Sequence, residues 1–189
     1  MDKFKNKYRI PPARLQSWNY ASEGMYFITI CTKNREHTFG EIENNIMKYS
    51  QLGEEVDRVW PNTIILRPDM KIELGEFQVM PNHFHAIVII GANEYNNVPE
   101  ISMVNKNTPL IQNKFGSQSK NLAAIVKGFK AAITSFAKLN DIAFSWQTRY
   151  HDHIIRNEEE YYRISEYILN NVYNWKDDKF YTPEIYILP

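Results

Sequence analysis

Short apolar segments of the chain have the pattern of β-strands. Residues 25–32 (MYFITICT) are rich in aromatic and β-branched residues, which favour extended backbone on a pleated sheet. Pro81 and Asn82 separate two further runs and predict a turn, so these two runs are expected to form an antiparallel hairpin. The predicted strands are residues 25–32, 71–79, 83–90 and 150–156.

Other segments repeat apolar residues at helical spacing. The first runs from residue 45 to 60, where Ile46, Tyr49, Leu52, Val56 and Val59 share one face and Pro61 ends the pattern. The second runs from about 120 to 139. The third begins after Asn157, a capping residue, and carries three glutamates in its first turn, where the helix dipole favours anions.

The order of these elements predicts the fold. Strand, helix, strand, strand, helix, strand and a last helix form an α+β chain, a ferredoxin-like βαββαβ sandwich with an antiparallel sheet and an extra C-terminal helix. The length suits one domain spanning residues 1–189. Within it, the polar, asparagine-rich residues 91–119 are expected to be an inserted loop, and residues 176–189 a C-terminal tail.

Composition narrows the possible settings and metals. No run of eighteen apolar residues is present, and the N-terminus lacks the apolar stretch of a signal peptide, so we expect a soluble, cytoplasmic protein with no membrane partner. The single cysteine, Cys31, leaves any metal site to histidine, amide and carboxylate groups. Such donors favour Mg²⁺ or Mn²⁺ over structural zinc.

Positive charge is segregated although the formal net charge is zero. No acidic residue occurs between Glu100 and Asp141, where six lysines fall, and a second basic arm near the N-terminus ends at Arg14. On the helix predicted from 120 to 139, Lys120, Lys127 and Lys130 lie opposite the apolar stripe. This side is either an ordinary solvated face or a surface that binds DNA.

Two histidines lie two residues apart at the start of a predicted strand. Because side chains alternate across a strand, His83 and His85 share one face with Ile87 and Ile89. Two neighbouring imidazoles are half of a site for a divalent metal. The alternative is that both are ordinary strand residues.

The last predicted helix supplies further candidate groups. Tyr167 and Asn171 are four residues apart and therefore share a helical face. If that face covers the histidine strand, a phenol and an amide oxygen approach the same metal region. A tyrosine, with a pKa of about 10, needs a nearby cation or metal to act as a nucleophile at neutral pH; core packing is the alternative.

Two more features remain open from the residues alone. Trp146 and Phe144 could stack on an unpaired base, or at least one of them could be buried in the core. His151 and His153 form a second pair around Asp152, for which strand packing or support of a site is the favoured reading.

Taken together, two blocks of the sequence resemble a known family. The histidine pair within VMPNHFHAIVII resembles the motif of the HUH single-strand DNA transposases. Trp146 and Gln147, the strand 150–156 and the helix carrying EYILNN resemble the REP-associated tyrosine transposase branch of these enzymes. The similarity spans about residues 8–175.

This resemblance implies a specific chemistry. Members are ferredoxin-like, bind hairpin-forming DNA and cleave a single strand through one helical tyrosine, leaving a 5′-phosphotyrosine link with the help of a divalent metal. It makes Tyr167 the nucleophile and His83, His85 and Asn171 the ligands of Mg²⁺ or Mn²⁺. It also implies single-stranded or hairpin DNA as the partner of a monomer or homodimer.

Other classes of protein remain possible from the sequence. A domesticated, non-catalytic DNA-hairpin-binding protein would keep the fold and lose the covalent step. An unrelated metallohydrolase would instead gather both histidine pairs around one ion and use water as its nucleophile.

Overall fold

The computed structural model describes residues 18–96 and 119–183. The N-terminal basic arm with Arg14, most of the predicted 91–119 loop and the last residues of the predicted tail lie outside the described residues. No helix in the two described ranges has the length and apolar character to cross a membrane.

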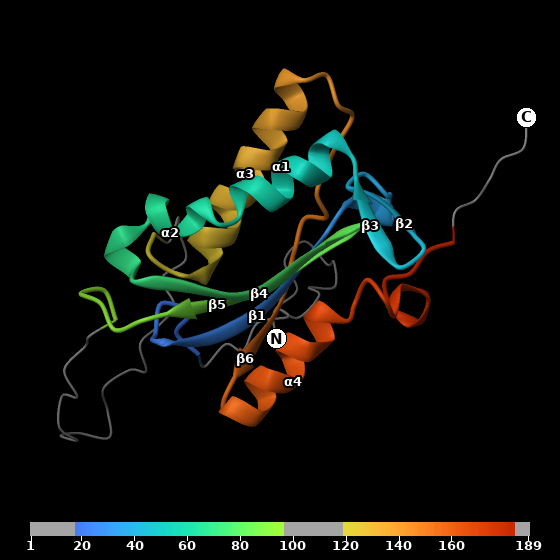
Figure 1. The fold of residues 1–189 in the computed structure, drawn as a ribbon. Helices are drawn as coiled ribbons and strands as arrows, with labels where there is room; N and C mark the ends of the chain where they lie inside the picture. Colours follow the sequence, from blue (N-terminus) through green and yellow to red (C-terminus); the bar gives the residue numbers. More distant parts are fainter. Residues whose placement is uncertain (1–17, 97–118, 184–189) are drawn as a thin grey trace, which may run out of the picture.

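One four-stranded antiparallel sheet forms the centre of the fold (Figure 1). Its strands, in the order β4-β5-β1-β6, are β1 (Gly24–Cys31), β4 (Ile72–Met80), β5 (His83–Ile90) and β6 (His151–Ile155). The four predicted strands are therefore confirmed to within a residue or so at each end. Because β5 lies between β1 and β4, the order is that of a split βαβ unit, and the predicted α+β class is confirmed.

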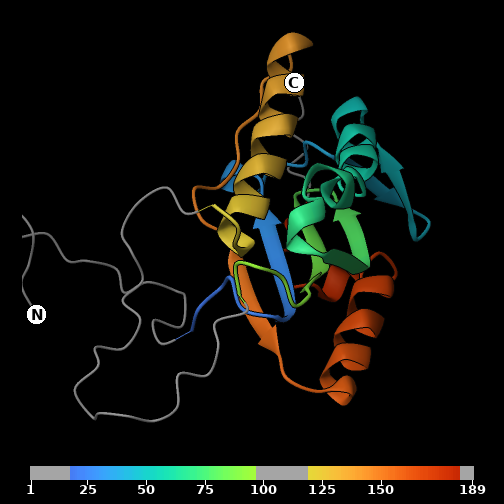
Figure 2. The same cartoon turned by 90° about the vertical axis from the view of Figure 1, so that its left-hand side faces the viewer.

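Helices cover the two faces of the sheet unequally (Figures 1 and 2). On one face, α1 (Gln51–Val59) and α3 (Leu122–Leu139) enclose the main core, in which the Trp60, Phe84 and Phe129 rings pack with centroids 5.0–5.1 Å apart. On the other face, α4 (Glu158–Leu169) buries a smaller apolar cluster with β1, β5 and β6. The sheet thus separates the α1–α3 layer from the α4 layer.

The helix predicted from residue 45 is wrong in its first part. Residues Gly40–Glu43 and Ile46–Tyr49 form a separate hairpin, β2 and β3. Asn44 and Asn45 have φ of 52° and 61°, the left-handed pair that a two-residue hairpin turn requires. Ile46 and Tyr49 fitted the helical spacing by coincidence, and the helix α1 starts only after Ser50, whose side chain accepts from the Gly53 N–H.

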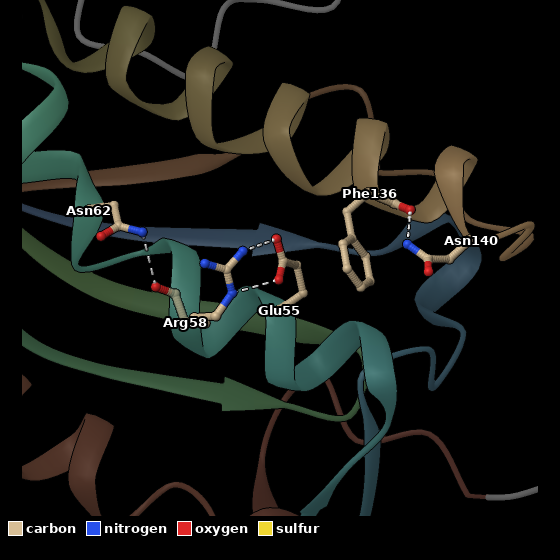
Figure 3. A network of polar contacts seen from close by, with 5 residues as sticks. All are labelled: Glu55, Arg58, Asn62, Phe136 and Asn140. Carbon is tan, nitrogen blue, oxygen red and sulfur yellow. Dashed lines mark hydrogen bonds and ion pairs between the residues drawn. The ribbon is translucent and has the colours of Figure 1, made fainter.

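Short segments complete the path. After α1, the chain forms α2 (Asn62–Leu66) and the 3₁₀ turn η3 (Pro68–Met70) before β4; the other 3₁₀ turns are η2 (Lys33–Arg35) and η4 (Trp175–Asp177). Local polar contacts lie within α1 and at the C-terminal end of α3 (Figure 3): Arg58 binds Glu55 through two nitrogens at 2.7 and 2.9 Å, and Asn140 donates to the Phe136 carbonyl at 2.9 Å. These contacts join neighbouring turns of one helix and stabilise helix ends.

Candidate active site

The histidine pair lies at the start of β5, on the sheet face that α4 covers. His83 and His85 are both fully buried, opposite Cys31 and Thr29 of β1 in the strand register. They share their side of β5 with Ile87, which belongs to the apolar cluster under α4. The two imidazole centroids are 4.4 Å apart, so the predicted pairing of the rings on one face is observed.

Each imidazole has one nitrogen held by a neighbouring side chain. His83 Nδ1 lies 2.8 Å from Asn82 Oδ1, and His85 Nδ1 lies 2.9 Å from Thr29 Oγ1. The His83 Nε2 atom is buried and has no hydrogen-bond partner within the described part of the chain. A buried ring nitrogen of this kind is suited to binding a ligand or a metal.

Tyr167 reaches this pair from the last turn of α4. Its Oη lies 3.2 Å from His85 Nε2, and the hydroxyl donates to Asp178 Oδ2 at 2.9 Å. The residue is 37% exposed, so a substrate approaching from solvent can contact the phenol. The structure therefore brings the predicted nucleophile to the predicted metal region.

Asn171 also enters the site, although by a different route from the one expected. The helix α4 ends at Leu169, with Asn170 as its C-cap, so Asn171 lies in the following turn and not on the helix. Its Nδ2 donates to Asp178 Oδ2 at 2.7 Å. Because the carboxylate can only accept, the Asn171 Oδ1 is turned away from it, and this atom is buried without a partner among the described residues.

The chain after α4 supplies a carboxylate that the sequence reading missed. It turns through η4 and returns over the histidines, placing the Phe180 ring 4.7 Å from the His83 ring and the Trp175 ring 5.9 Å from it. The Phe180 N–H donates to Asp178 Oδ1 at 2.6 Å, which leaves Oδ2 to Tyr167 and Asn171. Asp178 lies in the segment assigned to the tail, and no local sequence pattern marked it.

These groups fit a divalent cation. His83, His85 and Asp178 each contribute one ligand atom, and these three atoms lie within 4.8 Å of one another. Asn171 lies in the same site, bound to Asp178, and its Oδ1 and the His83 Nε2 are buried atoms with no hydrogen-bond partner among the described residues. Two buried acceptors in one site are costly unless a cation compensates them.

Burial sets the protonation of the site. Loss of hydration lowers the pKa of His83 to about 3 and lowers that of His85 well below its ordinary value, the latter with a contribution from the neighbouring His83. Both rings are therefore neutral at pH 7, and no proton competes for the lone pair. Burial, followed by the charge of Asp178, raises the pKa of Tyr167, so without a cation the phenol stays protonated.

The structure separates the predicted DNA-binding lysines from this centre. Lys127 is exposed on α3, which lies in the layer on the opposite side of the sheet (Figure 2). Lys130 also lies on α3, where its Nζ donates to the Gln147 carbonyl at 2.6 Å. Lys120 precedes α3 and pairs with Asp69, so its predicted place on the helix face is wrong.

The aromatic candidate packs against the core. Trp146 is half-buried, its ring centroid lies 5.0–6.1 Å from those of Phe39, Phe129 and Phe144, and its indole N–H donates to the Lys130 carbonyl at 3.1 Å. Of the two readings that the sequence left open, the contacts favour packing over base stacking, because the ring packs against the main core.

The second histidine pair does not join the metal cluster. His153 Nε2 lies 2.7 Å from Glu160 Oε1, at the start of α4. The group of ligand atoms found within the described ranges contains neither His151 nor His153. The arrangement therefore gives no support to a four-histidine centre.

Known proteins are similar to this chain in sequence or in fold. No family model matches the chain. An uncharacterized protein from Haemophilus influenzae is 41% identical over 169 residues, which cover 89% of this chain and 91% of that protein. The solved structure of a REP-associated tyrosine transposase bound to a REP hairpin is 21% identical, with a TM-score of 0.51 over 91% of this chain and 74% of its own. The resemblance inferred from the sequence is thus confirmed at the level of the fold.

Proposed function

We propose that this chain is a metal-dependent enzyme that nicks and joins single-stranded DNA through Tyr167. The chain belongs to one family with the Haemophilus influenzae protein and has the fold of the REP-associated tyrosine transposase. The observation that carries the proposal is the contact of the half-exposed phenol with His85 and Asp178. A solvent-accessible nucleophile thereby meets a buried set of metal ligands.

The raised pKa of Tyr167 explains why such an enzyme needs a cation. Burial and the Asp178 carboxylate disfavour the phenolate. A divalent ion held by His83, His85, Asp178 and the Asn171 oxygen would supply positive charge beside the phenol and polarise the bound phosphate. Mn²⁺ and Mg²⁺ are the candidates, because the donor set combines imidazole with hard oxygens.

The covalent step balances without any further reactant. The Tyr167 oxygen attacks the phosphorus of a phosphodiester and loses its proton, and the bond from phosphorus to the 3′-oxygen breaks. The leaving strand end takes up a proton as a 3′-hydroxyl, and the other strand end stays on Tyr167 as a 5′-phosphotyrosine. Attack by a free 3′-hydroxyl reverses the step and joins two strands.

Cations around the site provide a place for the strand. Arg35 donates to the Lys179 carbonyl at 2.9 Å, and the charged ends of both side chains lie 4.8 Å from the centre of the Phe180 ring, which packs on His83. These groups are suited to the phosphates that flank the cleaved bond. The related structure binds a REP hairpin, so hairpin-forming DNA is the substrate class, with Lys127 and Lys130 left to contact DNA beyond the site. Monomer and homodimer are both compatible with this scheme.

The test is formation of a covalent adduct. Wild-type protein and Tyr167→Phe are incubated with labelled single-stranded hairpin DNAs and Mn²⁺ and run on a denaturing protein gel. We expect a shifted, Mn²⁺-dependent band with wild type and none with Tyr167→Phe, while Tyr162→Phe, an exposed tyrosine on the same helix, keeps the band.

Other outcomes separate the competing functions. Binding of hairpins without any adduct from wild type, across a varied panel of sequences, would replace the enzyme by a non-catalytic hairpin-binding protein. Cleavage that persists in Tyr167→Phe would instead identify water as the nucleophile and a metallohydrolase as the function.

A further inference from the structure

Asn82 is a fully buried amide in the turn directly before His83. Its backbone carbonyl accepts from both the N–H and the hydroxyl of Thr32, at 2.9 and 3.0 Å. The turn is therefore held to the loop after β1. Its side chain is directed toward His83 and the returning C-terminal segment.

The orientation of this amide follows from the groups around it. The Asn82 Nδ2 donates to the Phe180 carbonyl at 2.9 Å and lies 3.2 Å from the Thr182 hydroxyl. Since a carbonyl can only accept, the NH₂ end must face Phe180, and Oδ1 must face His83 Nδ1 at 2.8 Å. The proton of the neutral His83 ring is thus on Nδ1, and the lone pair is on the buried Nε2.

The same amide fixes the carboxylate. Asn82 holds the carbonyl of Phe180, and the N–H of Phe180 donates to Asp178 Oδ1 at 2.6 Å. One residue of the C-terminal segment therefore connects the Asn82 side chain to Asp178. This chain of contacts directs Asp178 Oδ2 to Tyr167 and Asn171.

We infer that Asn82 is a positioning residue with two roles. Its Oδ1 accepts from His83 Nδ1 and sets the tautomer of that ring, and its Nδ2 donates to the Phe180 carbonyl and holds the segment that carries Asp178. The inference rests on the proposed function for its purpose, since it explains how the ligands are oriented for a metal. Groups that orient metal ligands in this way change metal affinity about 10–100-fold when removed.

The first measurement is the tautomer of the His83 ring in metal-free protein. In ¹⁵N-labelled wild type, two-bond proton–nitrogen correlations of the imidazoles should show His83 protonated at Nδ1. In Asn82→Ala the preference should be lost or reversed. In Asn82→Asp, which keeps the acceptor but cannot donate, the Nδ1 proton should remain, while trypsin should cleave after Lys179 faster than in wild type.

Metal affinity is the second measurement. We expect the Kd for Mn²⁺, from electron paramagnetic resonance of the free ion, to rise about 10–100-fold in Asn82→Ala. Asn93→Ala is the matched control, because Asn93 is also a buried loop asparagine, bound to the Met70 and Gly91 carbonyls away from the site. It should leave the tautomer and the Kd unchanged.

Two results would overturn the inference: a wild-type His83 that carries its proton on Nε2, or a folded Asn82→Ala protein that keeps the wild-type tautomer and a Kd within twofold. A wild-type protein with the expected tautomer and no Mn²⁺ binding would support the role of Asn82 in orienting the ring and reject the metal centre of the proposed function.

Discussion

Replacing Asn171 with leucine should remove most of the stabilisation that Mn²⁺ gives this protein. In the structure the Asn171 oxygen is a buried acceptor with no donor among the described residues, in the same site as the His83 Nε2, which also lacks a partner there. A bound cation would satisfy both atoms, whereas leucine has a similar size and no oxygen. The change therefore tests whether this oxygen is a ligand.

The expected magnitude follows from ligand linkage. At a Mn²⁺ concentration about 100 times the Kd, an ion that binds only the folded chain stabilises it by about 2.7 kcal/mol, or about 5–11 °C in Tm for a domain of this size. If loss of the oxygen weakens binding about 100-fold, the upper end of the effect of groups that merely orient ligands, the stabilisation falls to about 0.4 kcal/mol. The Tm shift then falls to about 1–2 °C.

Without metal, the same substitution should be nearly neutral. Leucine removes an unsatisfied buried acceptor, which costs about 1–3 kcal/mol, and also removes the hydrogen bond from Asn171 to the Asp178 carboxylate, which contributes about 1.5–3 kcal/mol. These effects oppose each other. The free energy of unfolding in chelator should therefore change by less than about 1 kcal/mol.

The assay is thermal unfolding followed by circular dichroism, in chelator and over a Mn²⁺ series. Asn171→Asp keeps an oxygen at this position and should retain the Mn²⁺ shift, while Asn170→Ala, at the exposed neighbouring position, should behave as wild type. A wild-type Mn²⁺ shift in folded Asn171→Leu would refute the ligand assignment and leave His83, His85 and Asp178 as the set.

Further predictions concern protons, packing and the strand. The pKa values of His83 and His85 are lowered in the folded state, so the unfolded chain binds more protons below about pH 6.5. The free energy of unfolding of the metal-free protein should therefore fall as pH drops from about 6.5 toward 3, by up to about 1.4 kcal/mol per pH unit for each ring. Urea unfolding at several pH values should show a weaker dependence of this free energy on pH in His83→Gln. Gly53→Ala should cost about 1–3 kcal/mol, since its methyl would lie 2.0 Å from the Phe39 carbonyl oxygen, whereas Gly128→Ala meets only the end of a flexible arginine side chain and should cost less in the same unfolding assay. Lys179→Gln should lower the salt dependence of single-strand binding by about 0.7 in log–log slope, measured by fluorescence anisotropy; an unchanged slope would exclude a phosphate contact there.

Local patterns predicted much of the fold because they act over a few residues. The β-branched and apolar runs located all four strands of the sheet, and Asn157 caps α4 as expected, accepting from the Glu160 N–H at 2.8 Å. The 45–60 helix failed at its start, where the Asn44–Asn45 turn was the overlooked signal. Two strand residues of β3 happened to match the helical period, and turn chemistry outweighed periodicity.

The approach of Tyr167 to His85 was expected only on the condition that the last helix covers the histidine strand. The structure fulfils that condition, because the apolar face of α4 packs on the same side of β5. Asn171 also lies at the site, but not on the helix as predicted, since α4 ends at Leu169 and the following turn carries the amide inward to Asp178. A spacing of four residues predicts proximity on a helix, and it cannot predict where the helix stops.

By itself, the sequence determined the strands, the start of the last helix and the shared face of His83 and His85, because alternation and capping depend on near neighbours in the chain. The resemblance to a known family singled out Tyr167 among the tyrosines of the last helix. Only the tertiary structure decided that Asp178 completes the site and that α3 places its lysines across the sheet from the tyrosine. Those outcomes depend on which face of the sheet each helix covers and on how the chain returns after α4. Packing of the whole chain sets both, and no local pattern records them.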